Sequence, residues 1–175
     1  MNLDFLLAQD ELGRLICDLS GVRADEPQIC HSAIEFGDGV TFSSADAKVY
    51  LPDGRVLPNG VNRWKSYLDW GSNDPAQWVR VRLPVTPDQE AIVRAACEET
   101  FAHGYGYDLK DLILGQTIGK WLKIKIQDDG KYVCSEFCTE KMQTIDWFTG
   151  WTPCWTAPIE DYRGSLAGGG VLIPC

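Results

Sequence analysis

The sequence predicts an α+β fold, in which an antiparallel sheet of about four to six strands packs against a helix that carries a cysteine at its N-terminus. Alternating apolar segments flank Gly37-Asp38-Gly39, which is a strong hairpin signal. A capped amphipathic helix follows Thr86, and a second apolar helical stripe begins at Cys134. With 175 residues, of which 45% are hydrophobic, the chain is long enough for one well-buried core, so we expect a single domain over residues 1–175.

The composition makes several classes of function unfavourable. Sixteen Lys and Arg against 25 Asp and Glu give a formal net charge of −9. Such a surface repels phosphate backbones, so we expect no nucleic-acid binding, and it also disfavours an electrostatic hold on anionic lipid. No apolar run reaches the roughly 18 residues that a transmembrane helix needs, so we expect no membrane span.

The cysteines and the N-terminus indicate the compartment. Seven cysteines are an odd number, and several of them lie on apolar stripes, which favours reduced thiols over a disulfide framework. Residues 1–7 contain no basic segment of the kind that opens a secretory signal. We therefore expect synthesis in the cytoplasm without a signal peptide.

The N-terminal half contains the expected strands and one helix. Strands are predicted over residues 5–8, 29–36, 40–44 and 78–83. A helix is expected from about Glu11, and its apolar stripe consists of Leu12, Leu15, Ile16 and Leu19. Residues 58–74 look like a loop. Alternation in the last strand places Arg80 and Arg82 on an exposed face.

The C-terminal half contains the clearest helix. Thr86 is the expected N-cap, Gln89 completes a capping box and Gly104 ends the helix. Its buried face is predicted to consist of Ile92, Val93, Ala96, Cys97 and Phe101. From residue 147 onward the chain is aromatic and rich in Pro and Gly, and we expect its aromatic side chains to pack under a long loop.

Cys134 and His31 are the candidate nucleophile and general base. A thiol becomes a useful nucleophile as the thiolate, and the N–H groups of a helix N-terminus lower its pKa. The same N–H groups can stabilise an oxyanion in acyl transfer. The alternative is that Cys134 opens the buried stripe of its helix and that His31 is a structural strand residue.

Metal binding is the competing use of cysteine and histidine. Cys134 and Cys138 are four residues apart, but no second close pair completes a four-ligand site, so we expect neither a metal nor another cofactor. Cys30 precedes His31 and is predicted to point to the opposite sheet face. Tyr107 is a candidate for lining a cleft beside the nucleophile, with packing as the alternative.

Four segments together resemble a known family: DFLLAQDELGRLICDLSG, CHSAIEFGDGVTFSSADAKV, GYGYDLKDLI and YVCSEF. They are similar to the circularly permuted NlpC-type papain-like cysteine peptidases and amidases, the YiiX-like group related to lecithin:retinol acyltransferase. The order is the permuted one, with histidine before cysteine, and the Trp-rich insert resembles phage and prophage versions. The resemblance implies Cys134 as the nucleophile and His31 as its base, in a protein of the host cytoplasm or a phage virion.

The resemblance also implies a third polar residue that orients the imidazole. Counting along the hairpin places Ser43 there, where the family often has histidine. A serine accepts a hydrogen bond from the imidazole but does not stabilise an imidazolium as a carboxylate does. Glu35 and Asp46 are possible substitutes, with a solvated surface position as the favoured alternative for both.

Three functions follow as hypotheses. The first is a cysteine hydrolase that cleaves an amide or peptide bond, with a peptidoglycan stem peptide as the expected substrate of a phage version. The second is a thioesterase or lipid acyltransferase on the same fold. The third is a binding or structural protein without catalysis.

Overall fold

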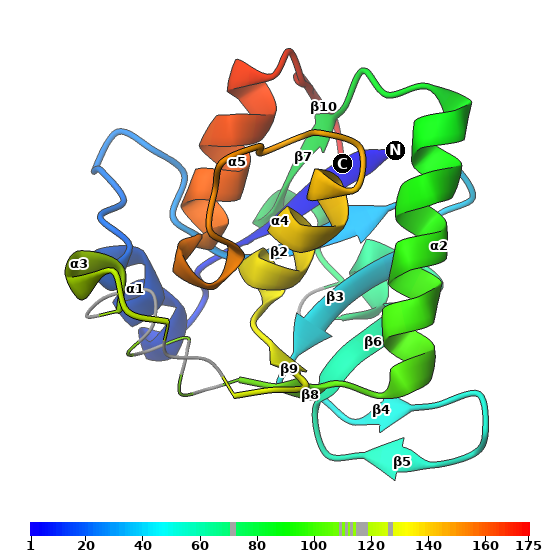
Figure 1. The fold of residues 1–175 in the computed structure, drawn as a ribbon. Helices are drawn as coiled ribbons and strands as arrows, with labels where there is room; N and C mark the ends of the chain where they lie inside the picture. Colours follow the sequence, from blue (N-terminus) through cyan, green and yellow to red (C-terminus); the bar gives the residue numbers. More distant parts are fainter. Residues whose placement is uncertain (71–72, 109, 111, 113, 115–118, 126–127) are drawn as a thin grey trace.

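The centre of the molecule is a six-stranded antiparallel sheet with the strand order β10-β7-β1-β2-β3-β6 (Figure 1). The computed structural model describes residues 1–175 except 71–72, 109, 111, 113, 115–118 and 126–127. The sheet strands are β1 (Asn2–Leu7), β2 (Ile29–Glu35), β3 (Thr41–Ala45), β6 (Gly60–Trp64), β7 (Trp78–Arg82) and β10 (Val171–Ile173). The α+β architecture and the antiparallel sheet are therefore as the sequence predicted.

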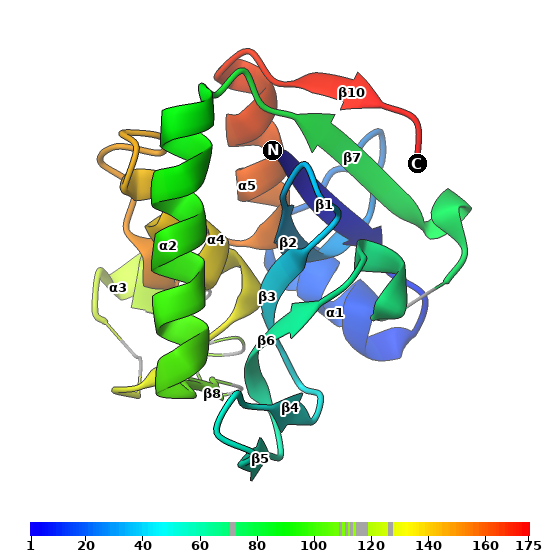
Figure 2. The ribbon, with the colours of Figure 1, turned by 90° about the vertical axis from the view of Figure 1, so that its right-hand side faces the viewer.

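Helices pack around this sheet. They are α1 (Glu11–Leu19), α2 (Pro87–His103), α3 (Lys120–Leu122), α4 (Cys134–Gln143) and α5 (Pro158–Ala167). Figure 2 shows α2, α4 and α5 on one side of the sheet. Two small strand pairs complete the description, β4 (Val49–Tyr50) with β5 (Val56–Leu57) and β8 (Gly106–Tyr107) with β9 (Lys131–Tyr132).

The two sheet faces have separate apolar clusters. The larger cluster lies between the sheet and the helices α2, α4 and α5, and it includes Leu3, Phe5, Ile34, Phe42, Phe137, Met142 and Ile159. The smaller cluster on the other face consists of Leu6, Tyr67 and Trp78, with Leu68 and Trp70 packed against it. The face of the sheet to which a strand side chain points therefore determines which of the two clusters it can pack against.

Helix α2 confirms its predicted ends. The Thr86 hydroxyl accepts a hydrogen bond from the N–H of Gln89 at 3.2 Å, and the Gln89 side chain accepts one from the N–H of Thr86 at 2.9 Å. Gly104 ends the helix in the left-handed region, with φ of 72°. The predicted buried face is wrong for Ile92, which is 50% exposed, because the helix packs through residues one position further around its surface.

Helix α1 differs from its prediction in the face that it buries. Leu12, Leu15 and Leu19 are 50%, 46% and 43% exposed, although the sequence places them on the apolar stripe. The helix instead packs through Gly13 and Cys17, which are buried. A Cβ atom on Gly13 would lie 3.1 Å from Ala8, so the missing side chain permits a close approach that larger residues prevent.

Arg80 is the centre of a buried charge network, which corrects its predicted exposure. Its Nε donates to Asp4 Oδ1 at 2.9 Å, its guanidinium also pairs with Glu35, and its Cζ lies 4.3 Å from the Tyr67 ring centroid. Burial raises the pKa of Asp4 to about 7 despite the opposing charge of Arg80. Glu35 is likewise buried and not a solvated surface residue, whereas Arg82 is exposed as predicted.

Three elements were missed because their sequences looked like loops. Strand β6 lies inside residues 58–74, and α5 and β10 follow residue 147. Pro158 at the start of α5 and Glu160, whose carboxylate accepts from the N–H of Ala157 at 2.9 Å, are the local signals of that helix. Within the ranges that the structure describes, no helix has the length and apolar character needed to cross a membrane.

Replacing Arg80 tests the buried charge network. We expect Arg80→Ala to lower the free energy of unfolding by about 3–5 kcal/mol, because it leaves the carboxylates of Asp4 and Glu35 buried without their cation. Urea unfolding at neutral pH measures this loss. Arg82→Ala on the same strand is the matched control and should change stability by less than about 0.5 kcal/mol. Equal effects of the two variants would contradict the network.

Candidate functional site

The thiol of Cys134 lies at the first position of α4 and is 1% exposed. The residue before it, Val133, is extended, with φ of −89° and ψ of 164°, and its side chain makes no capping hydrogen bond. Side-chain hydrogen bonds hold the backbone just before Cys134 and the residue just after it. The Ser44 hydroxyl donates to the carbonyl of Tyr132 at 2.7 Å, and the Ser135 hydroxyl donates to the carbonyl of Thr156 at 2.6 Å.

Burial dominates the acidity of this thiol. It raises the pKa of Cys134 to about 11, although hydrogen bonds from the Ser32 backbone, the Ser135 backbone and the Ser32 hydroxyl favour the thiolate. The charge of Asp161 acts in the same direction as burial. At neutral pH the nucleophile candidate is therefore a protonated thiol whose sulfur lies against the backbone of β2.

Asp161 is a buried polar residue of this site that the sequence did not reveal. Its carboxyl on α5 accepts hydrogen bonds from the Ser32 hydroxyl at 3.0 Å and from the Thr139 hydroxyl at 2.8 Å. The side chain is fully buried, and this burial raises its pKa well above the ordinary value. Its two partners come from β2 and α4, which are distant in sequence from α5, so no local sequence pattern could have identified it.

The imidazole of His31 faces the other side of the sheet. Successive strand residues point to opposite faces, and the next residue, Ser32, contacts α5 through Asp161. His31 instead pairs across the ladder with Leu6 and stacks on Trp70, with ring centroids 3.9 Å apart. The backbone of β2 therefore lies between the imidazole and the Ser32 hydroxyl beside the thiol.

This position keeps the imidazole neutral. His31 is 5% exposed, and its burial lowers the pKa to about 3 from an ordinary 6.5. Its Nε2 atom is buried and has no hydrogen-bond partner in the structure. The structure thus places His31 and the thiol of Cys134 on opposite faces of β2, without a hydrogen bond between His31 Nε2 and the thiol.

The third predicted residue, Ser43, is occupied elsewhere. Its hydroxyl donates to the carbonyl of Ser32 at 2.6 Å. In β3, Ser43 directly follows Phe42, which pairs with Ile34 of β2. Of the two substitutes, Glu35 pairs with Arg80, and Asp46 is exposed and accepts from the Asn59 side chain at 3.2 Å. The structure gives none of these side chains a hydrogen bond to His31.

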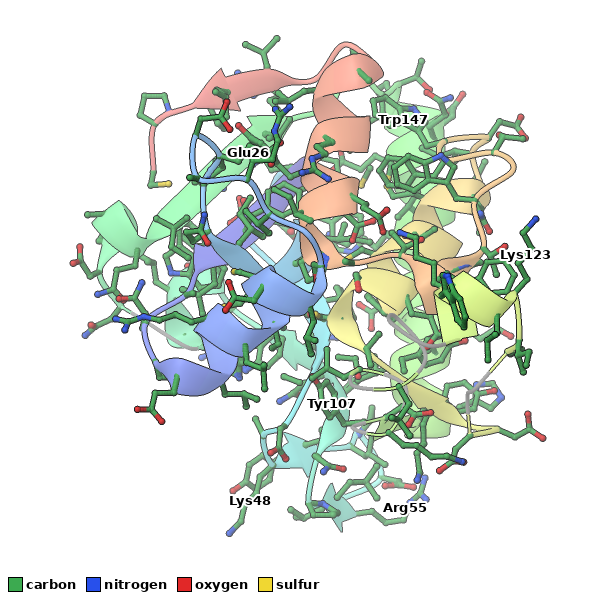
Figure 3. The ribbon with its side chains drawn as sticks, turned by 90° about the vertical axis from the view of Figure 1, so that its left-hand side faces the viewer. Glu26, Lys48, Arg55, Tyr107, Lys123 and Trp147 are labelled. Carbon is green, nitrogen blue, oxygen red and sulfur yellow. The ribbon has the colours of Figure 1, made fainter. Side chains whose placement is uncertain are left out.

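Cys30 and Tyr107 lie in electrostatic range of the thiol. Burial is the main cause that raises the pKa of Cys30 to about 12, and Cys134 adds to it. Burial also raises the pKa of Tyr107, again with a contribution from Cys134. Cys30 is on the thiol side of β2, opposite to His31, as its position in the strand predicted. Figure 3 shows Tyr107 on the side of the molecule where α1 and α3 are seen.

A cavity lies apart from the thiol. Its volume is about 530 Å³, and its walls include Trp151, Trp155, Lys120 and Arg163, from α3, α5 and the segment before α5. No cluster of three or more His, Cys, Asp or Glu side chains suited to a metal occurs in the part of the chain that the structure covers. Comparison with protein-family models, curated proteins and solved structures finds no match.

The pH dependence of alkylation tests the surroundings of the thiol. We expect the rate at which iodoacetamide labels Cys134, measured by peptide mass spectrometry, to increase with pH. The midpoint of this increase should lie at about pH 11. Asp161→Asn removes a negative charge and should lower this midpoint. Asp129→Asn, an exposed acidic residue, is the control and should leave it unchanged. A midpoint below the ordinary thiol value of 9.0 in the unaltered protein would contradict the burial of this group.

Acid unfolding tests the neutral state of His31. Between its ordinary pKa of 6.5 and its folded pKa of about 3, the unfolded chain binds a proton that the folded chain does not. His31 therefore lowers the free energy of unfolding as the pH decreases through this window, by up to about 1.4 kcal/mol per pH unit, whereas Asp4, with its folded pKa raised to about 7, acts in the opposite direction. In urea titrations from pH 7.5 to pH 5, the free energy of unfolding of His31→Gln should fall less, or rise more, with decreasing pH than that of the unaltered protein. His103→Gln, at an exposed histidine, should retain the slope of the unaltered protein, and equal slopes for all three would refute the assignment.

Proposed function

We propose that the chain is a cysteine hydrolase of the permuted papain-like class, which cleaves an amide or peptide bond through an acyl-enzyme on Cys134. In this reaction His31 takes the thiol proton, the sulfur attacks the carbonyl carbon, and the amine leaves with that proton. Water then attacks the thioester carbonyl, His31 takes a proton from the water, and the thiol is restored as the acid leaves.

One observation carries this proposal: a helix begins with a thiol whose sulfur lies against the backbone of the residue that follows the histidine. The N–H groups at the start of α4 favour a thiolate and a neighbouring oxyanion. His31 directly precedes Ser32 in β2, and Ser32 contacts the thiol. The resemblance implies a peptide or a peptidoglycan stem peptide as the substrate.

The resting arrangement opposes proton transfer. Moving a proton from a thiol with a pKa of about 11 to an imidazole with a pKa of about 3 costs on the order of 11 kcal/mol. A turnover of about 10 per second allows a total barrier of only about 16 kcal/mol. Little would remain for the attack itself, and the imidazole lies on the face of β2 opposite to the thiol, so turnover requires an arrangement in which the imidazole is both more exposed and closer to the thiol.

Trp70 is the side chain whose movement would expose the imidazole. It covers the imidazole at a centroid distance of 3.9 Å, and it contacts the second tryptophan, Trp64, at 5.9 Å. Displacing Trp70 would expose His31 to water and return its pKa toward 6.5. We therefore propose that a bound substrate displaces Trp70, and that the free protein has low thiol reactivity.

Turnover of amide substrates by four proteins tests this function. A panel of peptides and muropeptides is assayed with the unaltered chain, Cys134→Ala, His31→Gln and Trp70→Ala. We expect Cys134→Ala to abolish hydrolysis and His31→Gln to lower it by about 100-fold or more, because general-base catalysis contributes about that much. Trp70→Ala should accelerate labelling of Cys134 at neutral pH.

Trp151→Ala is the matched control for the loss of a tryptophan, since this residue lies at the separate cavity. It should leave the labelling rate of Cys134 unchanged. Hydrolysis that persists in Cys134→Ala, or a labelling rate that Trp70→Ala does not alter, would contradict the proposal.

A binding or structural protein without catalysis is the second candidate. The neutral, buried pair favours it, as does Ser43, whose hydroxyl bonds to the backbone and not to His31. Under this candidate no amide in the panel is hydrolysed, and both Trp70→Ala and His31→Gln leave the labelling of Cys134 as it is.

A further inference from the structure

Residues 120–125 form a short exposed surface segment with large apolar side chains. Every residue from Lys120 to Lys125 is exposed. Trp121 is 81% exposed, the highest value among the large apolar side chains described, and Leu122 and Ile124 are 47% and 52% exposed. A tryptophan side chain with this much exposed area indicates a surface that contacts a membrane or another molecule.

The same segment is basic in an acidic protein. Lys120, Lys123 and Lys125 alternate with the apolar residues, whereas the whole chain has a net charge of −9. Lys120 pairs with Glu160, while Lys123 ends α3 in the left-handed region and points away from the body in Figure 3. At physiological salt the Debye length is about 8 Å, so distant carboxylates are screened and the local positive charge decides what binds here.

The segment is held on the body of the protein at two points. The Trp155 indole N–H donates to the carbonyl of Ile124 at 3.3 Å, and the Lys120–Glu160 ion pair links α3 to α5.

We propose that residues 120–125 dock the protein on an anionic lipid bilayer. Tryptophan, leucine and isoleucine enter the interface between head groups and acyl chains, and lysine stems lie along the apolar surface while their ammonium groups contact lipid phosphates. Each lysine near an anionic surface strengthens binding by about fivefold. The alternation of cations with exposed apolar side chains suits a bilayer, whose head groups and acyl chains contact both kinds of side chain at once.

This docking surface revises the expectation that the acidic composition disfavours anionic lipid. The net charge describes the whole surface, but a bilayer meets one side of a protein. The proposal does not depend on the proposed hydrolase activity, because neither Cys134 nor His31 belongs to the segment.

Sedimentation with vesicles tests the docking surface. The full chain is mixed with vesicles of phosphatidylcholine and phosphatidylglycerol in equal parts, and separately with pure phosphatidylcholine vesicles. We expect binding to the anionic vesicles, a blue shift of tryptophan fluorescence that Trp121→Phe reduces, and a loss of affinity of about 25-fold in Lys123→Gln/Lys125→Gln. Cys134→Ala should bind as the unaltered chain does, which separates this result from the test of catalysis.

The β4–β5 hairpin provides a matched control. It carries Lys48 and Arg55 beside Tyr50, which is 66% exposed, and Figure 3 shows both cations far from Lys123. Lys48→Gln/Arg55→Gln removes the same charge and should leave vesicle binding unchanged. The proposal is overturned if anionic vesicles do not bind, if pure phosphatidylcholine binds equally well, or if the hairpin variant loses as much affinity as the segment variant.

Discussion

The hydrogen bonds that Ser32 and Thr139 donate to the buried carboxyl of Asp161 are the constraint on which the site depends. They join β2, α4 and α5 at one point, and an unpaired carboxyl at this depth would cost several kcal/mol. The network fixes the start of α4, and therefore the thiol of Cys134, against the backbone of β2. Its position also determines which residues of β2 face the helices and which face the other side.

The side chains of β2 alternate between the two faces of the sheet, and this alternation explains the protonation states of His31 and Cys134 in the free protein. Because Ser32 faces Asp161, the adjacent His31 faces Trp70 and the smaller apolar cluster. Burial then raises the pKa of the thiol and lowers that of the imidazole, so that both groups are neutral. The same arrangement accounts for a protected thiol.

Local signals in the sequence were sufficient for part of this structure. The Gly37-Asp38-Gly39 turn and the Thr86 capping box depend on residues close in the chain, and both are observed. The role of Arg80 could not be predicted, because Asp4 and Glu35 are distant in sequence and meet it only in the folded sheet. Helix α1 was assigned correctly, but its buried face depended on the close approach that Gly13 permits. The candidates His31 and Cys134 came from the sequence, whereas Asp161 and the stacking of Trp70 required the tertiary structure.

The titration of His31 by NMR tests the central claim most directly. Side-chain nitrogen and proton shifts are followed from pH 8 to pH 5, with His103→Gln used to assign the two histidines. The account predicts that the His31 imidazole stays neutral over this range in the free protein and begins to titrate within it when Trp70 is replaced by alanine. A midpoint near the ordinary 6.5 in the unaltered protein would contradict it.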